Sequence, residues 1–537
     1  RLVAAPILKG RSRSWIFLLI VGFATIGSTL LIYTKDVTVK LLPFDNKSEL
    51  QIIADLPEGT SLEMTDRVLA AIAREVQVVP EITNIQSHVG SAAPFGFNGL
   101  VRHYYLRAMP EQGDLQVNLK EKHDRDRTSH EIALQIRKLI ANVKVPAGTS
   151  LKVVEVPPGP PVMATLLAEI YGPSPQIRRD VASELRKLFE AVPFVVDVDD
   201  SFGAPTERAR LRIDQDNLEY YRVEQGDIYQ TIEYYLNGQV VGYSHKGNGR
   251  RPVEIAVKPN KSDLAISERL LSIPVPQNVI PGDRGVVELG DVVRIDMEKV
   301  SFPIFRHNGR SAEMVMAELA GEFEAPIYGM LAIQEKIDAH DWGNLPKPEI
   351  ILHGQPKDES KVAMLWDGEW EVTWVTFRDM GAAFAIAILG IYALVVAQFH
   401  SFRVPLVVLT PIPLTLIGIM VGHWLFDAAF TATSMIGFIA LAGIIVRNSI
   451  LLVDFVGHEK GSGKELRDVL LEAGSIRFKP IMLTALAAMI GAAVILADPI
   501  FQGLAISLLF GLASSTLLTV LVIPAIYVAL KGPEKTM

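Results

Sequence analysis

The sequence contains no cysteine among its 537 residues. Disulfides, zinc–thiolate sites and thiol nucleophiles are therefore excluded. The residue spacings of zinc proteases and serine hydrolases are also missing. A short GSGKE segment at Gly461 has neither the spacing of a phosphate-binding loop nor its hydroxyl residue. We therefore expect that the chain is not an enzyme and that it holds neither a metal ion nor a cofactor.

Charged residues are scarce in two parts of the chain. The sequence is 49% hydrophobic and 21% charged, and its apolar residues are concentrated in one N-terminal segment and after residue 374. The net charge of −8 comes mainly from the hydrophilic middle, and it lacks the basic footprint of a nucleic-acid-binding protein. The composition indicates a membrane protein with a large hydrophilic domain.

Six apolar runs are long enough to cross a bilayer as helices. They are residues 15–33, 380–398, 404–426, 432–456, 481–497 and 500–530. The joins at 399–403 and 458–479 and both ends of the chain carry Lys and Arg, so we expect these segments in the cytoplasm. Residues 1–34 then form the N-terminus and first span, and the region after residue 34 lies on the other side of the membrane.

The hydrophilic middle has the element order of α/β modules. Strand, helix, strand, strand, helix and strand follow one another in residues 35–157, which predicts a ferredoxin-like split βαβ unit with a strand over 101–109. A second unit is predicted over 158–207 and 300–356, with 349–352 as its last strand. A mostly-β module, 208–299, is inserted into it. Residues 357–537 begin with an amphipathic helix at 359–377, anchored at the membrane surface by Trp366, Trp370 and Trp374, and continue with five transmembrane helices.

Arg447 interrupts the apolar run 432–456 near its middle. Arginine stays charged in proteins, and a charge at this depth costs about 2.5–3.5 kcal/mol even on lenient insertion scales. The polar end of the run is roughly 15 Å away along the helix, which is beyond the reach of the side chain. Arg447 therefore needs a carboxylate or a watered cavity inside the membrane, or backbone carbonyls and lipid headgroups.

Four segments together resemble one family. They are GIIVRNSILLVDF, RFKPIMLTALAAMIG, SSTLLTVLVIPAIY and the hydrophilic PPGPPV. The chain resembles the C-terminal half of a resistance–nodulation–division (RND) permease, hydrophobe/amphiphile branch. The resemblance implies half of a proton/drug antiporter in a multidrug efflux pump of the Gram-negative inner membrane, with periplasmic porter and docking modules. It also implies a homotrimer, a periplasmic adaptor, an outer-membrane channel, and the proton motive force in place of a cofactor.

The same resemblance assigns a proton relay. The lysine of the family falls on Arg447, followed by the matching Asn448, while Thr484 and Arg477 match a polar threonine and an arginine at the start of the next span. Arginine in place of lysine keeps the charge but brings a rigid fork of donors. The proton-accepting aspartate pair of the family lies on the other pump half, which is thus an expected partner.

The resemblance also places a flexible substrate loop at 93–99, with Phe95, Gly96 and Phe97, and Tyr105 facing the same cavity. Aromatic residues beside glycines suit a mobile apolar surface for amphiphilic molecules. The alternative is that the two phenylalanines only cover the core of the first module.

Two other functions remain open at this stage. A heavy-metal exporter of the same superfamily would need clustered thioether ligands for soft ions, and Met109 and Met163 stand without further methionines near them in the sequence. The second open function is that of a membrane scaffold of related fold, which either transports nothing or handles lipids or polypeptides. The substrate is not determined by the sequence.

Overall fold

The computed structural model describes residues 3–533, except 95, 157–158, 160, 205, 246–251, 261–263, 265–267, 279–284, 322 and 460–462. The chain divides into two compact units. One consists of Arg1–Phe202 with Ile304–Met537, and the other of Gly203–Pro303.

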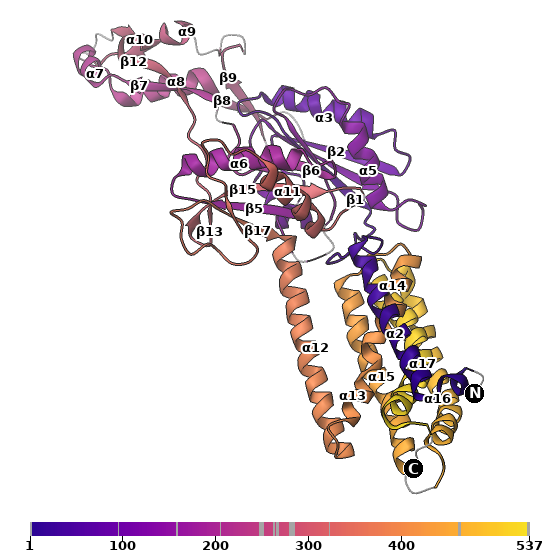
Figure 1. The fold of residues 1–537 in the computed structure, drawn as a ribbon. Helices are drawn as coiled ribbons and strands as arrows, with labels where there is room; N and C mark the ends of the chain where they lie inside the picture. The colour runs from indigo at the N-terminus through magenta and orange to yellow at the C-terminus, as the bar shows by residue number, and fades with distance from the viewer. Residues whose placement is uncertain are drawn as a thin grey trace. The chain divides into compact units, whose positions relative to one another are not determined.

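In the described part of the chain, six helical segments are long and apolar enough to cross a membrane, which confirms the prediction of six spans (Figure 1). They are α2 (Arg11–Tyr33), α12 (Glu369–Phe399), α13 with α14 (Val404–Leu409 and Pro411–Leu425), α15 (Ala432–His458), α16 with η3 (Leu466–Ala493 and Val494–Ala497) and α17 (Gln502–Lys531). The third span breaks after Leu409 because Pro411 lacks the amide hydrogen that would continue the helix. A short helix, α1 (Ala4–Ile7), precedes α2.

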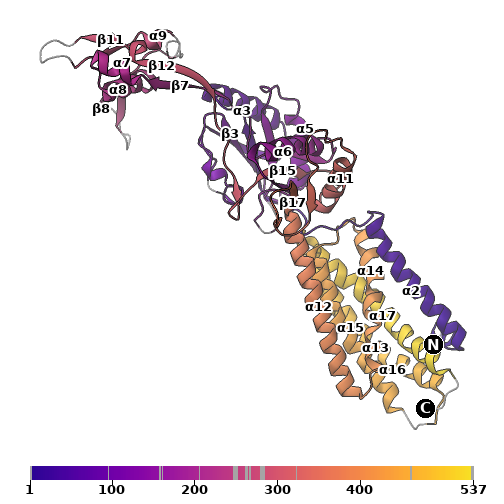
Figure 2. The same ribbon diagram turned by 60° about the vertical axis from the view of Figure 1, so that its left-hand side comes forward.

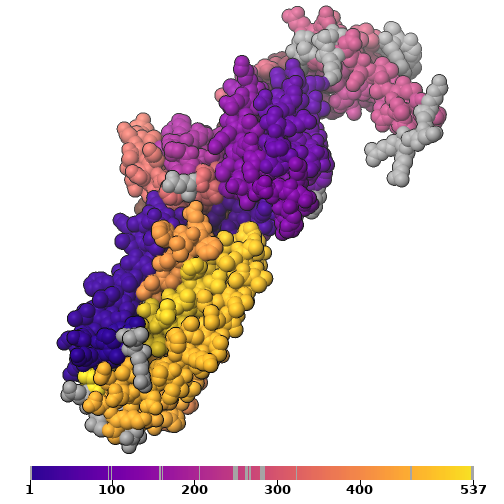
Figure 3. Space-filling view, turned by 90° about the vertical axis from the view of Figure 1, so that its right-hand side faces the viewer, coloured from indigo at the N-terminus to yellow at the C-terminus, as the bar shows by residue number. Residues whose placement is uncertain are grey.

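The last helix, α17, packs against α2, α14, α15 and α16 (Figure 2). The first span therefore lies beside the last, as the indigo and yellow surfaces show (Figure 3). Gly418 and Gly422 let α14 approach α17 closely, since a Cβ atom at Gly418 would lie 2.1 Å from the carbonyl oxygen of Phe510. Such pairs of small residues four positions apart are typical of closely packed membrane helices.

The first α/β module is a four-stranded antiparallel sheet in the order β2-β3-β1-β4, covered by two helices. Its elements are β1 (Glu49–Asp55), α3 (Leu62–Val76), β2 (Ile82–Val89), β3 (Gln112–Leu119), α5 (Ser129–Ile140) and β4 (Ser150–Val154). Ser61 and Thr128 cap the two helices through their side-chain oxygens. This topology is the predicted ferredoxin-like unit. The predicted strand 101–109 is wrong: α4 (Phe97–Val101) and the short helix η1 (Tyr104–Leu106) occupy that segment, and His103 between them has a left-handed φ of 58°.

The second module is a five-stranded sheet in the order β16-β17-β5-β15-β6. Its elements are β5 (Leu166–Tyr171), α6 (Pro175–Glu190), β6 (Val195–Asp200), β15 (Glu313–Leu319), α11 (Pro326–Ala339), β16 (Glu349–Ile351) and β17 (Ala363–Gly368), with the hairpin β13 (Arg306–His307) and β14 (Arg310–Ser311) beside them. Strand β17 pairs with β5, so the predicted last strand at 349–352 lies at the edge of the sheet instead.

The predicted surface helix at 359–377 is wrong in its first half. Residues 363–368 form β17, and Trp366 is buried against Phe189 with ring centroids 5.7 Å apart. Tryptophans four residues apart imitate a helix face in the sequence. Only Trp370 and Trp374 lie on a helix, at the start of α12, where their rings stack 6.1 Å apart.

Where its residues are described, the smaller unit combines short helices with three two-stranded sheets, β7-β12, β8-β9 and β10-β11. Its elements are β7 (Glu207–Ile213), α7 (Gln215–Tyr221), α8 (Gln225–Asn237), β8 (Gln239–Ser244), β9 (Val253–Val257), α9 (Glu268–Leu271), β10 (Pro274–Pro276), β11 (Val286–Glu288), α10 (Leu289–Val292) and β12 (Val293–Lys299). Ile228, Leu270 and Leu289 are fully buried in its own core, so this unit carries an independent apolar cluster.

Candidate functional site

Arg447 lies in the interior of α15, a helix of 27 residues. The helix begins at a capping box formed by Thr431 and Ser434, and His458 is its last residue. Arg447 stands 11 residues before that end, which is roughly 16 Å along the axis. The structure therefore places a permanent cation deep inside a membrane-spanning segment.

The two residues after Arg447 lie on the buried side of the helix. Asn448 and Ser449 are buried, whereas the side chain of Arg447 is exposed on the surface of the six-helix bundle. Among the described residues, Arg447 has no hydrogen bond and no ion pair. Asp454, the acidic residue of the same helix, lies closer to the helix end, and its carboxylate is 3.5 Å from Nδ1 of His458. The guanidinium group of Arg447 thus has no partner in this part of the chain.

The two predicted relay residues on α16 have partners of their own. Thr484 is also exposed, and its hydroxyl donates to the carbonyl oxygen of Pro480 at 3.0 Å. Arg477 lies with its guanidinium 6.0 Å from the ring centroid of Phe455 on α15. The structure thus joins neither residue to Arg447 by a hydrogen bond.

The predicted substrate loop lies over a cavity of about 340 Å³ at the surface of the first module. Gly96, Phe97 and Tyr105 line it, together with Gln51 and Gln116 from the sheet. Phe97 is 45% and Tyr105 46% exposed, so both rings are half open to solvent. Neither Phe97 nor Tyr105 is among the residues that pack against the core of the module. Phe95 lies outside the described residues.

Asp114, in a buried ion pair with Arg107, holds the start of this loop and the segment that follows it, which the sequence did not indicate. Asp114 accepts hydrogen bonds from the amide of Ala93 at 3.0 Å and from Nε of Arg107 at 2.7 Å. Arg107 also binds Asp55 at 2.6 Å. Burial raises the pKa of Asp114, although Arg107 opposes that rise. No sequence spacing marks these three residues, because Asp55 lies on a strand 52 residues before Arg107.

A narrow cleft of about 90 Å³ separates the two α/β modules, and ion pairs cross it. Every cation belongs to the first module and every carboxylate to the second. The pairs are Arg102 with Glu318 at 2.6 Å, Arg137 with Asp197 at 2.6 Å, and Lys152 with Asp199. Burial alone would lower the pKa of Lys152, but Asp199 and its other acidic neighbours raise it above the usual range.

Two methionines line the same cleft. Met163 comes from the segment before β5, and Met316 comes from β15. The sequence singled out Met163 but not Met316, because the two are distant in the chain. Met109 is exposed and is not among the residues lining this cleft.

Known proteins share this architecture. A crystal structure of a heavy metal efflux pump superimposes with a TM-score of 0.77 over 98% of this chain and 50% of that chain, at 18% identity. The swarming motility protein SwrC of Bacillus subtilis is 26% identical over 67% of this chain and 32% of its own length. The cobalt-zinc-cadmium resistance protein CzcA of Cupriavidus metallidurans is 23% identical over 68% of this chain and 33% of its own length.

A multidrug relative matches over a shorter region. The multidrug resistance protein MdtC of Yersinia enterocolitica is 31% identical over 31% of this chain and 17% of its own length. The chain spans about a third of the length of SwrC and CzcA in these matches. The profile of the AcrB/AcrD/AcrF family matches residues 6–531, nearly the whole sequence, and the chain therefore belongs to that family of RND permeases.

Proposed function

We propose that this chain is one half of a proton-driven export permease. The observation that carries the proposal is Arg447, a cation in the interior of a span, exposed on the bundle and without a counter-ion among the described residues. An uncompensated charge at bilayer depth is costly, and such residues pair with other groups inside a membrane protein. The natural partner is a carboxylate pair on the other pump half, whose helices would cover this face.

Arg447 would couple protons to movement through that pair. Arginine does not release its own proton, so the partner carboxylate takes up and releases the proton. When that carboxylate is charged it attracts Arg447, and when it is protonated the attraction is lost and the helices shift. Asn448, Thr484 and Arg477 would supply hydrogen bonds in one of the two arrangements.

The loop pocket would receive the substrate. Its half-exposed Phe97 and Tyr105 offer flat apolar surfaces, while Gln51 and Gln116 supply polar groups. Sites of this kind hold amphiphilic molecules, since most of the contact is apolar and a few polar groups orient the ligand. We place the protein in the Gram-negative inner membrane, with its α/β modules in the periplasm, as a homotrimer joined to an adaptor and an outer-membrane channel.

Reconstitution with the other half tests the coupling. Arg447→Ala should abolish proton-driven export, and Arg447→Lys should retain a good part of it, because the positive charge stays in place. Arg403→Ala is the control, since Arg403 is an exposed cation just before α13. Each variant is first shown to assemble normally. Proton-coupled export by Arg447→Ala at the wild-type rate would refute the mechanism.

A second candidate is the export of metal cations. Met163 and Met316 line the cleft between the modules, and thioethers are ligands for soft ions such as Cu(I). CzcA, the cobalt-zinc-cadmium resistance relative, is consistent with this candidate. The uptake of Cu(I) and the uptake of a fluorescent amphiphile into everted vesicles can be measured separately, which distinguishes metal export from the export of amphiphiles. Loss of Cu(I) uptake in Met163→Leu with unchanged amphiphile transport would favour metal export. A scaffold would transport neither.

A further inference from the structure

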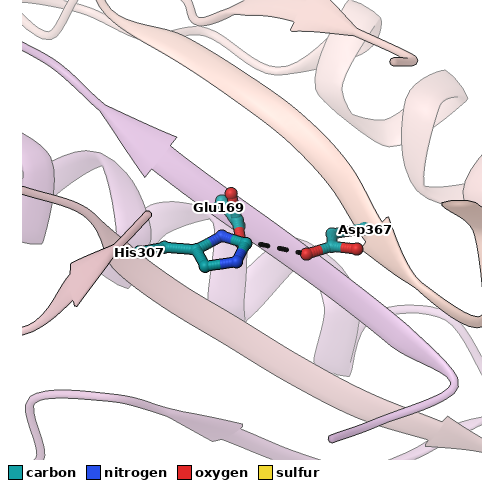
Figure 4. Close-up of side chains that lie close together, drawn as sticks. All are labelled: Glu169, His307 and Asp367. Atoms are coloured by element: carbon teal, nitrogen blue, oxygen red, sulfur yellow. Dashed lines mark ion pairs between the residues drawn. The ribbon is translucent and has the colours of Figure 1, made fainter. Parts of the chain in front are cut away.

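Three side chains from distant parts of the sequence converge on the second α/β module. Glu169 lies on β5, His307 on the β13–β14 hairpin and Asp367 on β17 (Figure 4). One ligand atom of each residue lies within 4.8 Å of the ligand atoms of the other two. Ligand atoms that share one zinc ion, each about 2.0–2.2 Å from it, are at most about 4.4 Å apart, so small side-chain movements would bring all three atoms within reach of one ion.

The register of the sheet explains why the two carboxylates meet. Glu169 pairs with Leu365 across the β5–β17 ladder, and Asp367 lies two residues beyond Leu365. Side chains two residues apart on a strand point to the same face. Glu169 and Asp367 therefore project diagonally toward each other.

Two atoms of this cluster, Oε1 of Glu169 and Nδ1 of His307, are buried. They are in direct contact as an ion pair, without a hydrogen bond of normal geometry among the described residues. The Glu169 side chain is 0% exposed, and its other oxygen accepts a hydrogen bond from the hydroxyl of Tyr171 at 2.5 Å. Burying a carboxylate without full compensation is costly. A cation bound by Oε1, Nδ1 and the carboxylate of Asp367, which lies 4.0 Å from Nδ1, would replace the direct contact of the first two atoms and compensate both carboxylates.

The surroundings hold the cluster in place. The turn after His307 is made by Asn308 and Gly309, both with positive φ, 48° and 80°, as a tight two-residue hairpin requires. The side-chain amide nitrogen Nε2 of Gln355 donates to the carbonyl oxygen of His307 and to the hydroxyl of Tyr171, at 3.0 Å each. Metal ligands are commonly oriented by an outer ring of hydrogen bonds of this kind.

We propose that Glu169, His307 and Asp367 form a binding site for a divalent cation of the zinc class. One imidazole and two carboxylates are ligands that zinc accepts, and three protein ligands leave a fourth position for water. The site is distinct from the loop pocket and the module cleft, so it does not depend on the proposed export function. A bound ion would tie the hairpin to β5 and to β17, which leads directly into α12.

The test is zinc binding by the purified full chain in detergent, without a polyhistidine tag and after treatment with a chelator. Isothermal titration with ZnCl2 should give one equivalent bound. His307→Ala and Asp367→Asn should each weaken zinc binding at least tenfold. Gln355→Ala should weaken it about tenfold, because the hydrogen bonds that orient His307 and Tyr171 are lost. The matched control is His340→Ala, because His340 is a half-buried histidine on another part of the module, 3.7 Å from a single carboxylate, Glu184.

A second readout separates ligation from folding. The wild-type chain with Co²⁺ should show visible absorption bands that Asp367→Asn loses, while its circular dichroism without metal stays the same. Asp367→Asn is isosteric, so it serves where His307→Ala fails to fold. Three results would overturn the proposal: no zinc bound by the wild-type chain, equal zinc binding by the wild-type chain and both ligand variants, or binding of Ca²⁺ or Mg²⁺ in preference to zinc.

Discussion

His130 of the first α/β module lies 2.7 Å from the carboxylate of Glu324 in the second, from ring nitrogen Nε2 to Oε1. Its other ring nitrogen lies 2.9 Å from Glu155, and the ring stacks on Phe44 with centroids 4.3 Å apart. Lys40 is 3.6 Å from Glu324. One imidazole thus joins two modules through two carboxylates, which requires that it be protonated.

The stability of the chain should therefore depend on pH through His130. Burial alone would lower the pKa of His130, but the hydrogen bonds to Glu155 and Glu324 raise it to about 9. A pKa raised above the unfolded value near 6.5 means that the stabilisation is complete below about pH 6.5 and is lost as pH rises through about 9. We expect a loss on the order of 2 kcal/mol, allowing for partial exposure.

The measurement is the melting temperature of the wild-type chain and of His130→Gln between pH 6 and pH 10. The difference between the two proteins should be largest at pH 6 and shrink toward pH 10. A difference that stays constant over this range would show that His130 packs in the interface without acting as a cation.

The ion pair between Lys152 and Asp199 should couple the two modules energetically. Removing one member of a buried pair leaves the other without compensation, so Lys152→Ala or Asp199→Ala should each lower stability by about 1–3 kcal/mol. The double variant should lose less than the sum, which a double-mutant cycle measures by thermal unfolding. The surface pair Lys347 and Asp338, 2.8 Å apart, is the control and should show almost no coupling. Strictly additive losses at Lys152 and Asp199 would contradict a direct interaction.

Gly418→Ala should destabilise the membrane bundle. Alanine usually stabilises a helix relative to glycine by about 1 kcal/mol, but a Cβ atom here would lie 2.1 Å from the carbonyl oxygen of Phe510 and would force α14 away from α17. Gly443→Ala on α15 is the matched control, since its Cβ atom would meet nothing within 4 Å. We expect a lower melting temperature for the first variant and an equal or higher one for the second, and equal values for the two would contradict the close packing.

Phe97→Ala combined with Tyr105→Ala should reduce export of bulky amphiphiles and leave the melting temperature unchanged, because both rings are half exposed and contribute little to the core. Tyr234→Ala in the smaller unit removes a comparably exposed ring outside the pocket and should leave export intact. Unchanged transport of every substrate tested would remove the loop pocket from the substrate route.

The sequence by itself determined the six spans, the two α/β modules with an insertion, and the isolated cation in the fourth span. These features depend on local properties: run length, periodicity, and the permanent charge of arginine. The family resemblance placed Gly96, Phe97 and Tyr105, which the structure brings to one cavity. Local patterns misled at 359–368, where tryptophan spacing suggested a helix and burial on both faces made a strand.

Only the tertiary structure decided which distant groups meet. Arg107 with Asp55, Lys152 with Asp199, and Glu169 with His307 and Asp367 are joined by strand register and by the packing of one module on another. The periodicity of the sequence does not predict these contacts, because they depend on the order of the strands in the sheet and not on residues that are neighbours in the chain. The exposure of Arg447 was also decided by the tertiary structure. Helix α17 packs against a different face of α15 and leaves the face with Arg447 uncovered.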